Sequence, residues 1–376
     1  TKMKAEKQKA EKEAFFCTTK ELSRLGLEQI PTQFQSHKHL IYSSPATLAF
    51  NSPGAEGFGV KRAGLAVPDS IMLIVAPGCC GRNTSLISSM KEYNDRFYYL
   101  MMDETDIVTG RHLKKIPKAV EEICSVCPKK PSVVMICITC VDALLGTDME
   151  RVCKKAEEQV EIPVRPCYMY ALTREGRKPP MVHVRQSLYS LIEPGKKKGN
   201  VVNLLGFFSP LVDDCEIYDL LHSAGVKTIH EISRCKDYKE YQTMSEANFN
   251  LVLHHEARFA AEDFHNRLQI PFIELRRLYQ TDKIENQYHA LGNALGVAFY
   301  DEKYKKQAED ALEKFRQKCP DASFAIGECL NADPFELSLA LIRYGFSVPE
   351  IYGTITVENF TYIRSLAKIS PETKVF

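Results

Sequence analysis

The sequence lacks an excess of charge of one sign and any long apolar run. Its 49 lysine and arginine residues balance 48 aspartate and glutamate residues, so no net field favours nucleic acid or an anionic membrane as a partner. No stretch approaches the roughly 18 consecutive apolar residues of a membrane span. Residues 1–16 are too rich in charge for a signal peptide. We therefore expect a cytoplasmic protein that binds neither nucleic acid nor a membrane.

The common nucleotide-binding signatures are also absent. The chain contains neither G-x-x-x-x-G-K-[ST] nor a G-x-G-x-x-G that follows a predicted strand. We therefore do not expect this chain to hydrolyse ATP or to bind NAD in the usual manner.

Cysteine, in contrast, is abundant, with 13 residues in 376. In a reducing compartment these residues are thiols or metal ligands rather than disulfides. Free cysteine also behaves as a small buried hydrophobe, so we expect about two to four ligands among about nine residues that only pack. To packing we assign Cys153, Cys167, Cys215, Cys235, Cys319 and Cys329.

A strand, a helix and a second strand are predicted between residues 132 and 167. Residues 132–140 form a nearly unbroken β-branched run, which is typical of a strand buried on both faces. Apolar residues at helical spacing predict a helix over Val141–Val160, and residues 162–167 resume an extended pattern. This is a βαβ unit, and Cys140 falls at the carboxyl end of its first strand, where such units bind ligands.

A second βαβ unit precedes the first in the chain. Residues 70–75 predict a buried strand, residues 83–91 a helix and residues 97–101 the next strand. The turn after the first strand contains Cys79 and Cys80. Two units therefore present cysteine at a strand-to-helix turn, which is the strongest internal indication of a site.

Further βαβ units predict an α/β protein of two to three Rossmann-like, doubly wound domains with parallel sheets. We expect a helical lead-in over residues 1–42 and a first domain, with the cysteine turns, over 43–195. A second domain is expected over 200–318 and a third over 319–376, with a linker at 194–199. The last residues resemble the beginning of another strand, so we expect the third domain to be incomplete. Whether a C-terminal tail is missing does not follow from the sequence.

The spacing of four cysteines also allows a zinc site. Cys124-x-x-Cys127 and Cys137-x-x-Cys140 form two pairs, as in a zinc knuckle. Cys137 lies inside a predicted buried strand, however, and the turn residues of a zinc ribbon are missing. Thiolates at the position of a phosphate-binding loop suit an iron–sulfur cluster better, because soft ligands select such clusters and loop amides donate to their sulfurs.

The motifs over residues 46–148 resemble the nitrogenase component 1 family. They comprise Pro77-Gly78-Cys79, Asp106-Ile107-Val108-x-Gly110, and the segment from Thr139 to Asp148. The family includes nitrogenase MoFe-protein subunits, cofactor scaffolds, the dark-operative protochlorophyllide reductase and the nickel-tetrapyrrole reductive cyclase. The later βαβ units are similar to the family more loosely.

The resemblance implies a set of cluster ligands. The family's cysteines carry over to Cys79 and Cys140 as ligands of an iron–sulfur cluster at a subunit interface, with Cys80 as a further candidate. Phe50 stands where the family has a third cysteine. Four ligands from two chains would then hold one [4Fe–4S] cluster about a two-fold axis. The expected assembly is a homodimer or a heteromer with a related subunit.

A second candidate site follows the predicted strand at residues 250–253. His254 falls where nitrogenase has the cysteine that anchors its metal cofactor, which argues against nitrogen fixation. His254 and His255, with Glu256 and Arg258, could bind a second metallocofactor, a tetrapyrrole or a substrate carboxylate, or donate protons. An equally weighted interpretation is that the two histidines merely cap the end of a strand.

These expectations together describe an oxidoreductase. Electrons from a separate ATP-dependent reductase, similar to the nitrogenase iron protein, would pass through the cluster to a substrate near His254. The first alternative is a scaffold, without catalytic activity, on which a metallocluster or cofactor is assembled. The second is a metal-free βαβ binding protein whose cysteines only pack. The substrate and the nuclearity of the cluster do not follow from the sequence.

Overall fold

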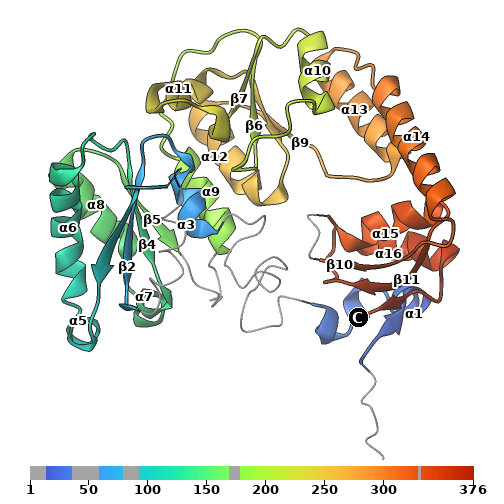
Figure 1. Cartoon of the computed structure of the whole chain (residues 1–376), viewed down its shortest axis with the longest axis horizontal. Coiled ribbons are helices and arrows are strands. Elements are labelled where there is room, and N and C mark those ends of the chain that lie inside the picture. Colours follow the sequence, from blue (N-terminus) through green and yellow to red (C-terminus); the bar gives the residue numbers. More distant parts are fainter. Residues whose placement is uncertain (1–13, 36–58, 79–90, 92, 169–177, 329–331) are drawn as a thin grey trace, which may run out of the picture. The chain divides into compact units, whose positions relative to one another are not determined.

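The computed structural model describes residues 14–35, 59–78, 91, 93–168, 178–328 and 332–376. It contains three four-stranded sheets (Figure 1). By internal contacts the chain divides into two compact units, which are described separately. One comprises residues 39–277 and 282–307, and the other residues 1–38, 278–281 and 308–376. The expected α/β architecture with parallel sheets is confirmed.

The first sheet of the larger unit has the strand order β3-β2-β4-β5, and all its pairs are parallel. Its strands are β2 (Ile71–Ala76), β3 (Phe97–Met101), β4 (Val134–Ile138) and β5 (Val164–Tyr168). Every residue of β2 and β4 is buried, because successive side chains enter cores on opposite faces of the sheet.

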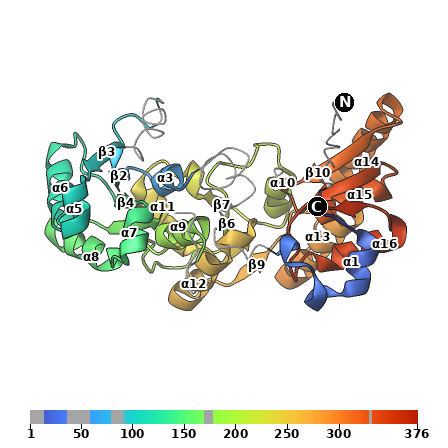
Figure 2. The same ribbon diagram turned by 90° about the horizontal axis from the view of Figure 1, so that it is seen from below.

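Helices cover both faces of this sheet (Figures 1 and 2). Apolar side chains of α6 (His112–Val126) and α8 (Met149–Val160) belong to one core, and those of α3 (Val60–Ala63) and α9 (Pro180–Tyr189) belong to the other. The short helix α5 (Glu104–Thr109) precedes α6. The prediction of a single helix over residues 141–160 is wrong.

That segment forms two helices instead, α7 (Cys140–Leu145) and α8. Gly146 has a φ of 68°, a left-handed conformation that interrupts a helix. The Asp148 side chain then accepts a hydrogen bond from the N–H of Arg151 and begins α8 as its N-cap. The strand-to-helix turn at Cys140 is therefore followed by a separate, short helix.

The second sheet of the larger unit has the order β7-β6-β8-β9 and is also parallel. Its strands are β6 (Val201–Leu205), β7 (Thr228–Glu231), β8 (Phe249–Val252) and β9 (Phe272–Glu274). Its helices are α10 (Glu216–Ser223), α11 (Tyr238–Gln242), α12 (Arg258–Leu268), α13 (Thr281–Leu295) and α14 (Glu302–Lys318), the last of which continues into the smaller unit. One apolar core includes residues of both sheets, such as Met135 and Val252.

The sheet of the smaller unit has the order β1-β12-β11-β10. Its strands are β1 (Cys17–Thr18), β10 (Ser323–Gly327), β11 (Ser347–Tyr352) and β12 (Lys374–Val375), and its helices are α1 (Thr19–Leu25), α15 (Pro334–Arg343) and α16 (Phe360–Ile369). The strand expected near the end of the chain is confirmed as β12, which pairs in parallel with β11. The antiparallel pairing of β1 with β12 was not predicted.

The remaining short elements are 3-10 turns. They are η1 (Leu27–Gln29), η2 (Thr32–Phe34), η4 (Gly64–Ala66), η5 (Ile232–Arg234), η6 (Thr243–Glu246) and η7 (His255–Ala257). The helix predicted over residues 83–91 and most of the lead-in predicted over residues 1–42 lie outside the described residues. Among the helices that the structure does describe, none is long and apolar enough to cross a membrane.

Candidate functional site

The carboxyl ends of β2 and β4 meet at one edge of the first sheet. The two strands pair in parallel, with Val75 opposite Ile138. Strand β4 ends at Ile138, and Cys140 begins α7 two residues later, as the sequence predicts for a strand-to-helix turn. Cys79 and Cys80 directly follow Gly78 in the chain but lie outside the described residues. Their approach to Cys140 therefore stays a prediction.

Two buried polar groups flank Cys140 in the chain. Thr139 and Asp142 are each 1% exposed, and within the part of the chain that the structure describes neither Thr139 Oγ1 nor Asp142 Oδ2 has a hydrogen-bond partner. Buried polar atoms are normally paired, so each exception calls for an explanation. The burial of Thr139 agrees with the buried strand predicted over residues 132–140, whereas no sequence pattern marked Asp142 as buried.

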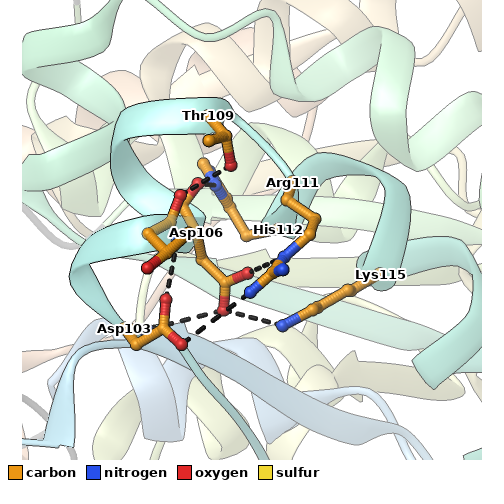
Figure 3. Close-up of polar contacts among 7 residues, drawn as sticks. Asp103, Asp106, Thr109, Arg111, His112 and Lys115 are labelled. Atoms are coloured by element: carbon orange, nitrogen blue, oxygen red, sulfur yellow. Dashed lines mark hydrogen bonds and ion pairs between the residues drawn. The ribbon is translucent and has the colours of Figure 1, made fainter.

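The corner between α5 and α6 lies next to this turn and is built on Asp106 (Figure 3). The Asp106 carboxylate accepts from Arg111 Nε and from Lys115 Nζ, each at 2.7 Å. These contacts, with Lys115 first, lower the pKa of Asp106 to about 2. Asp103 caps α5, and its side chain accepts from the N–H of Asp106 at 2.7 Å. The side chains of Asp103 and Asp106 therefore organise this turn.

His112 connects this corner to α7. Its Nε2 lies 2.8 Å from Asp142 Oδ1, and its Nδ1 lies 3.1 Å from the carbonyl oxygen of Asp106. Both side chains of the His112–Asp142 pair are buried. No local sequence pattern indicates this contact, because the two residues are 30 positions apart.

The four-cysteine zinc site does not fit the structure. Cys137 is fully buried and belongs to the core on one face of the first sheet, whereas Cys124 and Cys127 pack against the core on the other face. Cys127 Sγ is instead 3.1 Å from the hydroxyl of Tyr98, whose pKa this contact raises to about 12. Among the residues described, no group of three or more potential ligands could hold a metal ion.

The cysteines assigned to packing have different environments. Cys153 and Cys167 are buried, and burial raises the pKa of both thiols. Burial also raises the pKa of the half-buried Cys235, to about 12. Cys215 is half-buried as well. Cys319 is exposed, so its assignment to packing is wrong. Cys329 lies outside the described residues.

The second candidate site follows β8. His254 is the N-cap of η7, and its Nδ1 accepts from the N–H of Glu256 at 3.3 Å. Its ring stacks on that of His255 at a centroid distance of 4.6 Å and meets the edge of Phe207 at 5.7 Å. Since a backbone N–H can only donate, a neutral His254 carries its proton on Nε2. In this state Nδ1 is occupied by the backbone and offers no lone pair to a metal.

Gly206 allows the backbone to pass directly beside His254. Its φ is 134°, and a Cβ atom at this position would lie 2.8 Å from both the nitrogen and the Cβ of His254. Only glycine fits here without displacing the histidine. Gly206 and His254 follow the adjacent parallel strands β6 and β8, so both lie at the carboxyl edge of the second sheet.

A buried ion pair supports this edge from within the larger unit. Arg185 in α9 is 0% exposed, and its Nη1 lies 2.7 Å from Glu256 Oε2. Arg185 Nε also donates to the carbonyl oxygen of Gly206 at 2.8 Å, and its guanidinium lies 4.6 Å from the centre of the Phe208 ring. Sequence reasoning missed Arg185, although a cation inside the apolar run of α9 is a usable signal.

Arg258, the expected substrate ligand, is bound within the chain. Its Nε and Nη2 donate to the two carboxylate oxygens of Glu274 in β9, at 2.9 and 3.1 Å. Such bidentate contacts fix the plane of a guanidinium. His254, His255, Glu256 and Arg258 lie close together because they belong to one short segment, residues 254–258. A role of Arg258 in binding a substrate stays a prediction.

Comparisons with known proteins agree on one group. The family model of nitrogenase component 1 type oxidoreductases matches residues 56–344. The nitrogenase iron-molybdenum cofactor biosynthesis protein NifE of Nostoc sp. is 25% identical over 262 residues, which are 66% of this chain and 54% of that protein. NifE of Clostridium pasteurianum is 24% identical over 256 residues, with the same coverages. The chain thus spans about half the length of these curated relatives.

A solved structure shares the fold. The structure described as nitrogenase Cp1 at pH 6.5 superposes with a TM-score of 0.66 at 19% identity, and the match covers 93% of this chain and 81% of that one. At this identity the likeness shows the arrangement of elements and not a shared activity.

Proposed function

The chain belongs to the nitrogenase component 1 type oxidoreductases, and on this basis we propose that it is a scaffold on which an iron–sulfur-based cofactor is assembled. The names of the similar proteins support this function, because they are cofactor biosynthesis proteins. The structural observation that carries it is the position of Cys140, a soft ligand at the carboxyl end of a buried parallel strand.

The residues present fit an iron–sulfur cluster at this edge. Cysteine thiolates are the usual ligands of such clusters, and hydrogen bonds to the cluster sulfurs tune them. The buried Thr139 hydroxyl, which has no partner among the residues that the structure describes, could supply such a bond. The residues that would hold the cluster are Cys79 and Cys140, with Cys80 as a further candidate. A bound cluster would supply reversible one-electron storage.

Two or three cysteines from one chain are too few for the four ligands of a [4Fe–4S] cluster. Two copies of the chain about a two-fold axis, or one copy and a related subunit, would complete the set. We therefore propose a dimer with the cluster at its interface. We further propose that an ATP-dependent iron-protein-like reductase acts as a partner, since this chain lacks a phosphate-binding loop.

The edge near His254 is proposed to hold the cofactor or precursor under assembly. The rings of His254 and Phe207, whose centres lie 5.7 Å apart, would pack against that ligand. Glu256 and Arg185 keep the histidine in place from the buried side. In this function the histidine pair binds and orients a ligand without a chemical step.

The second candidate function is the reductase expected from the sequence. In it the same cluster would pass electrons to a small-molecule or tetrapyrrole substrate, and His254 would act as a proton donor. The geometry of His254 favours this role over metal ligation, since Nδ1 is occupied by the Glu256 N–H. The names of the relatives favour the scaffold.

A transfer experiment separates the two functions. The protein, purified without oxygen, is incubated with a cofactor-free recipient of the same family, and the iron that moves to the recipient is measured. A scaffold delivers the cofactor held near His254 once per binding site and consumes no reductant catalytically. A reductase transfers no iron and, when supplied with the iron-protein-like partner, ATP and a reducible small-molecule or tetrapyrrole substrate, oxidises that partner over many turnovers.

Variants of the cysteines control this experiment. Cys140→Ser and Cys79→Ser should each abolish the iron content and the transfer, whereas Cys124→Ser should change neither. Cys124 is a suitable control because it lies in α6 and packs against the core on the opposite side from Cys137. Full iron content in Cys140→Ser would contradict the proposed site.

A further inference from the structure

A buried pair of side chains joins the α5–α6 corner to the helix that begins at Cys140. His112 and Asp142 meet through Nε2 and Oδ1 at 2.8 Å, and their side chains are 1% and 0% exposed. Polar groups are costly to bury unless they are paired. The pair is therefore a specific link between two elements that the chain separates by 30 residues.

The His112 ring is held at two points. Its Nδ1 faces the carbonyl oxygen of Asp106 at 3.1 Å, and a carbonyl oxygen can only accept. At the other end of the ring, Asp142 Oδ1 also accepts from the Thr147 hydroxyl at 3.0 Å. The imidazole is thus oriented by α5 on one side and by α7 with its following turn on the other.

The α5 side of this link is itself firmly anchored (Figure 3). Asp106 is bound by Arg111 and Lys115 through its carboxylate and belongs to a capping box with Asp103. Its carbonyl oxygen is therefore a fixed point for His112. A displacement of α7 would break the contact with His112 or would have to move this corner as well.

We propose that His112 and Asp142 are positioning residues that fix the turn carrying Cys140 and so present its thiolate to an iron–sulfur cluster. Asp142 lies two residues after Cys140 within the six-residue helix α7, so a restraint on one limits the other. Thr139 Oγ1 and Asp142 Oδ2 are both buried, and neither has a hydrogen-bond partner among the described residues, so this turn holds two polar atoms close to Cys140. The inference rests on the proposed function, because it assumes that Cys140 is a ligand.

The test compares two variants of the pair with a matched control. His112→Ala removes the link, and Asp142→Asn keeps an oxygen for His112 but removes the charge. His222→Ala is the control, because His222 is an exposed histidine of α10 whose Nδ1 lies 2.9 Å from the carbonyl oxygen of Val226, away from the α5–α6 corner. Each protein is purified without oxygen, and iron release to a chelator and the electron paramagnetic resonance spectrum of the reduced protein are recorded.

Loss of a residue that supports a metal ligand lowers metal affinity by about 10- to 100-fold. We expect His112→Ala to release iron at least about tenfold faster than the wild type and to shift the g-values of the cluster. Asp142→Asn should shift both measures less and in the same direction, and His222→Ala should shift neither. The g-values matter because a general loss of stability would not change them.

A further readout uses the metal-free protein. The alkylation rate of Cys140, followed by peptide mass spectrometry, should change in His112→Ala and stay constant in His222→Ala. A wild type without iron would overturn the proposed function and the inference with it. Iron in the wild type, with unchanged release, spectra and alkylation in both variants, would overturn the inference alone. If His112→Ala does not fold by circular dichroism, Asp142→Asn decides by the same measures.

Discussion

Removal of the carboxylate from the buried Arg185–Glu256 pair should strongly destabilise the larger unit. The Arg185 side chain is 0% exposed and that of Glu256 is 8% exposed. Glu256→Leu would leave a buried guanidinium without its carboxylate, which typically costs about 3–5 kcal/mol. A change of 1 kcal/mol shifts the melting temperature of a unit of this size by about 2–4 °C. We therefore expect a decrease of roughly 6–20 °C.

A double-mutant cycle tests whether the loss comes from the unpaired charge. Arg185→Met combined with Glu256→Leu removes both charges and should recover at least half of the loss, since apolar replacements of a buried pair are often tolerated. Asp213→Asn breaks an exposed pair with Arg234, in which Asp213 is 91% exposed, and should cost less than about 1 kcal/mol. Thermal melting followed by circular dichroism measures these three variants and Arg185→Met alone, which completes the cycle. The reasoning is refuted if Glu256→Leu and Asp213→Asn melt alike.

Two further predictions concern backbone space and pH. Gly206→Ala should lower the free energy of unfolding by about 1–3 kcal/mol, because Gly206 has a φ of 134° and an added Cβ would collide with the backbone of His254. Gly199→Ala is the control and should be nearly neutral, because an added Cβ would have nothing within 4 Å. Equal melting temperatures of the two variants would contradict this prediction. The pKa of Asp106 is lowered to about 2 by Lys115 and Arg111, so its stabilising contribution is complete above about pH 4 and is lost as the pH falls towards 2. Urea unfolding of Asp106→Asn should show a weaker pH dependence in this range than the wild type, and identical profiles would count against the ion pairs.

Much of the fold follows from local patterns in the sequence. The β-branched run that became β4 is buried at every residue, as expected for a central parallel strand. Strand β1, in contrast, has two residues and pairs with residues 374–375 at the other end of the chain, so no local pattern could reveal it. The break at Gly146 was missed because the apolar spacing continues past it, while its left-handed φ ends α7.

Only part of the candidate site could be predicted from the sequence. The place of Cys140 at a strand-to-helix turn could be predicted, since it depends on the residues beside it in the chain. The partners of His112 and Arg185 could not, because Asp142 and Glu256 lie 30 and 71 residues away. The resemblance to the nitrogenase component 1 family is confirmed by the match over residues 56–344. The relatives' names support the scaffold, first given as the alternative, over the reductase.

The content of iron and acid-labile sulfide in protein purified without oxygen tests the central claim most directly. Measured together with zinc and the oligomeric mass, it should give about two irons and two sulfides per chain in a homodimer, as one shared four-iron cluster requires. Iron-free protein, with or without zinc, would contradict the assignment of Cys79 and Cys140 as cluster ligands.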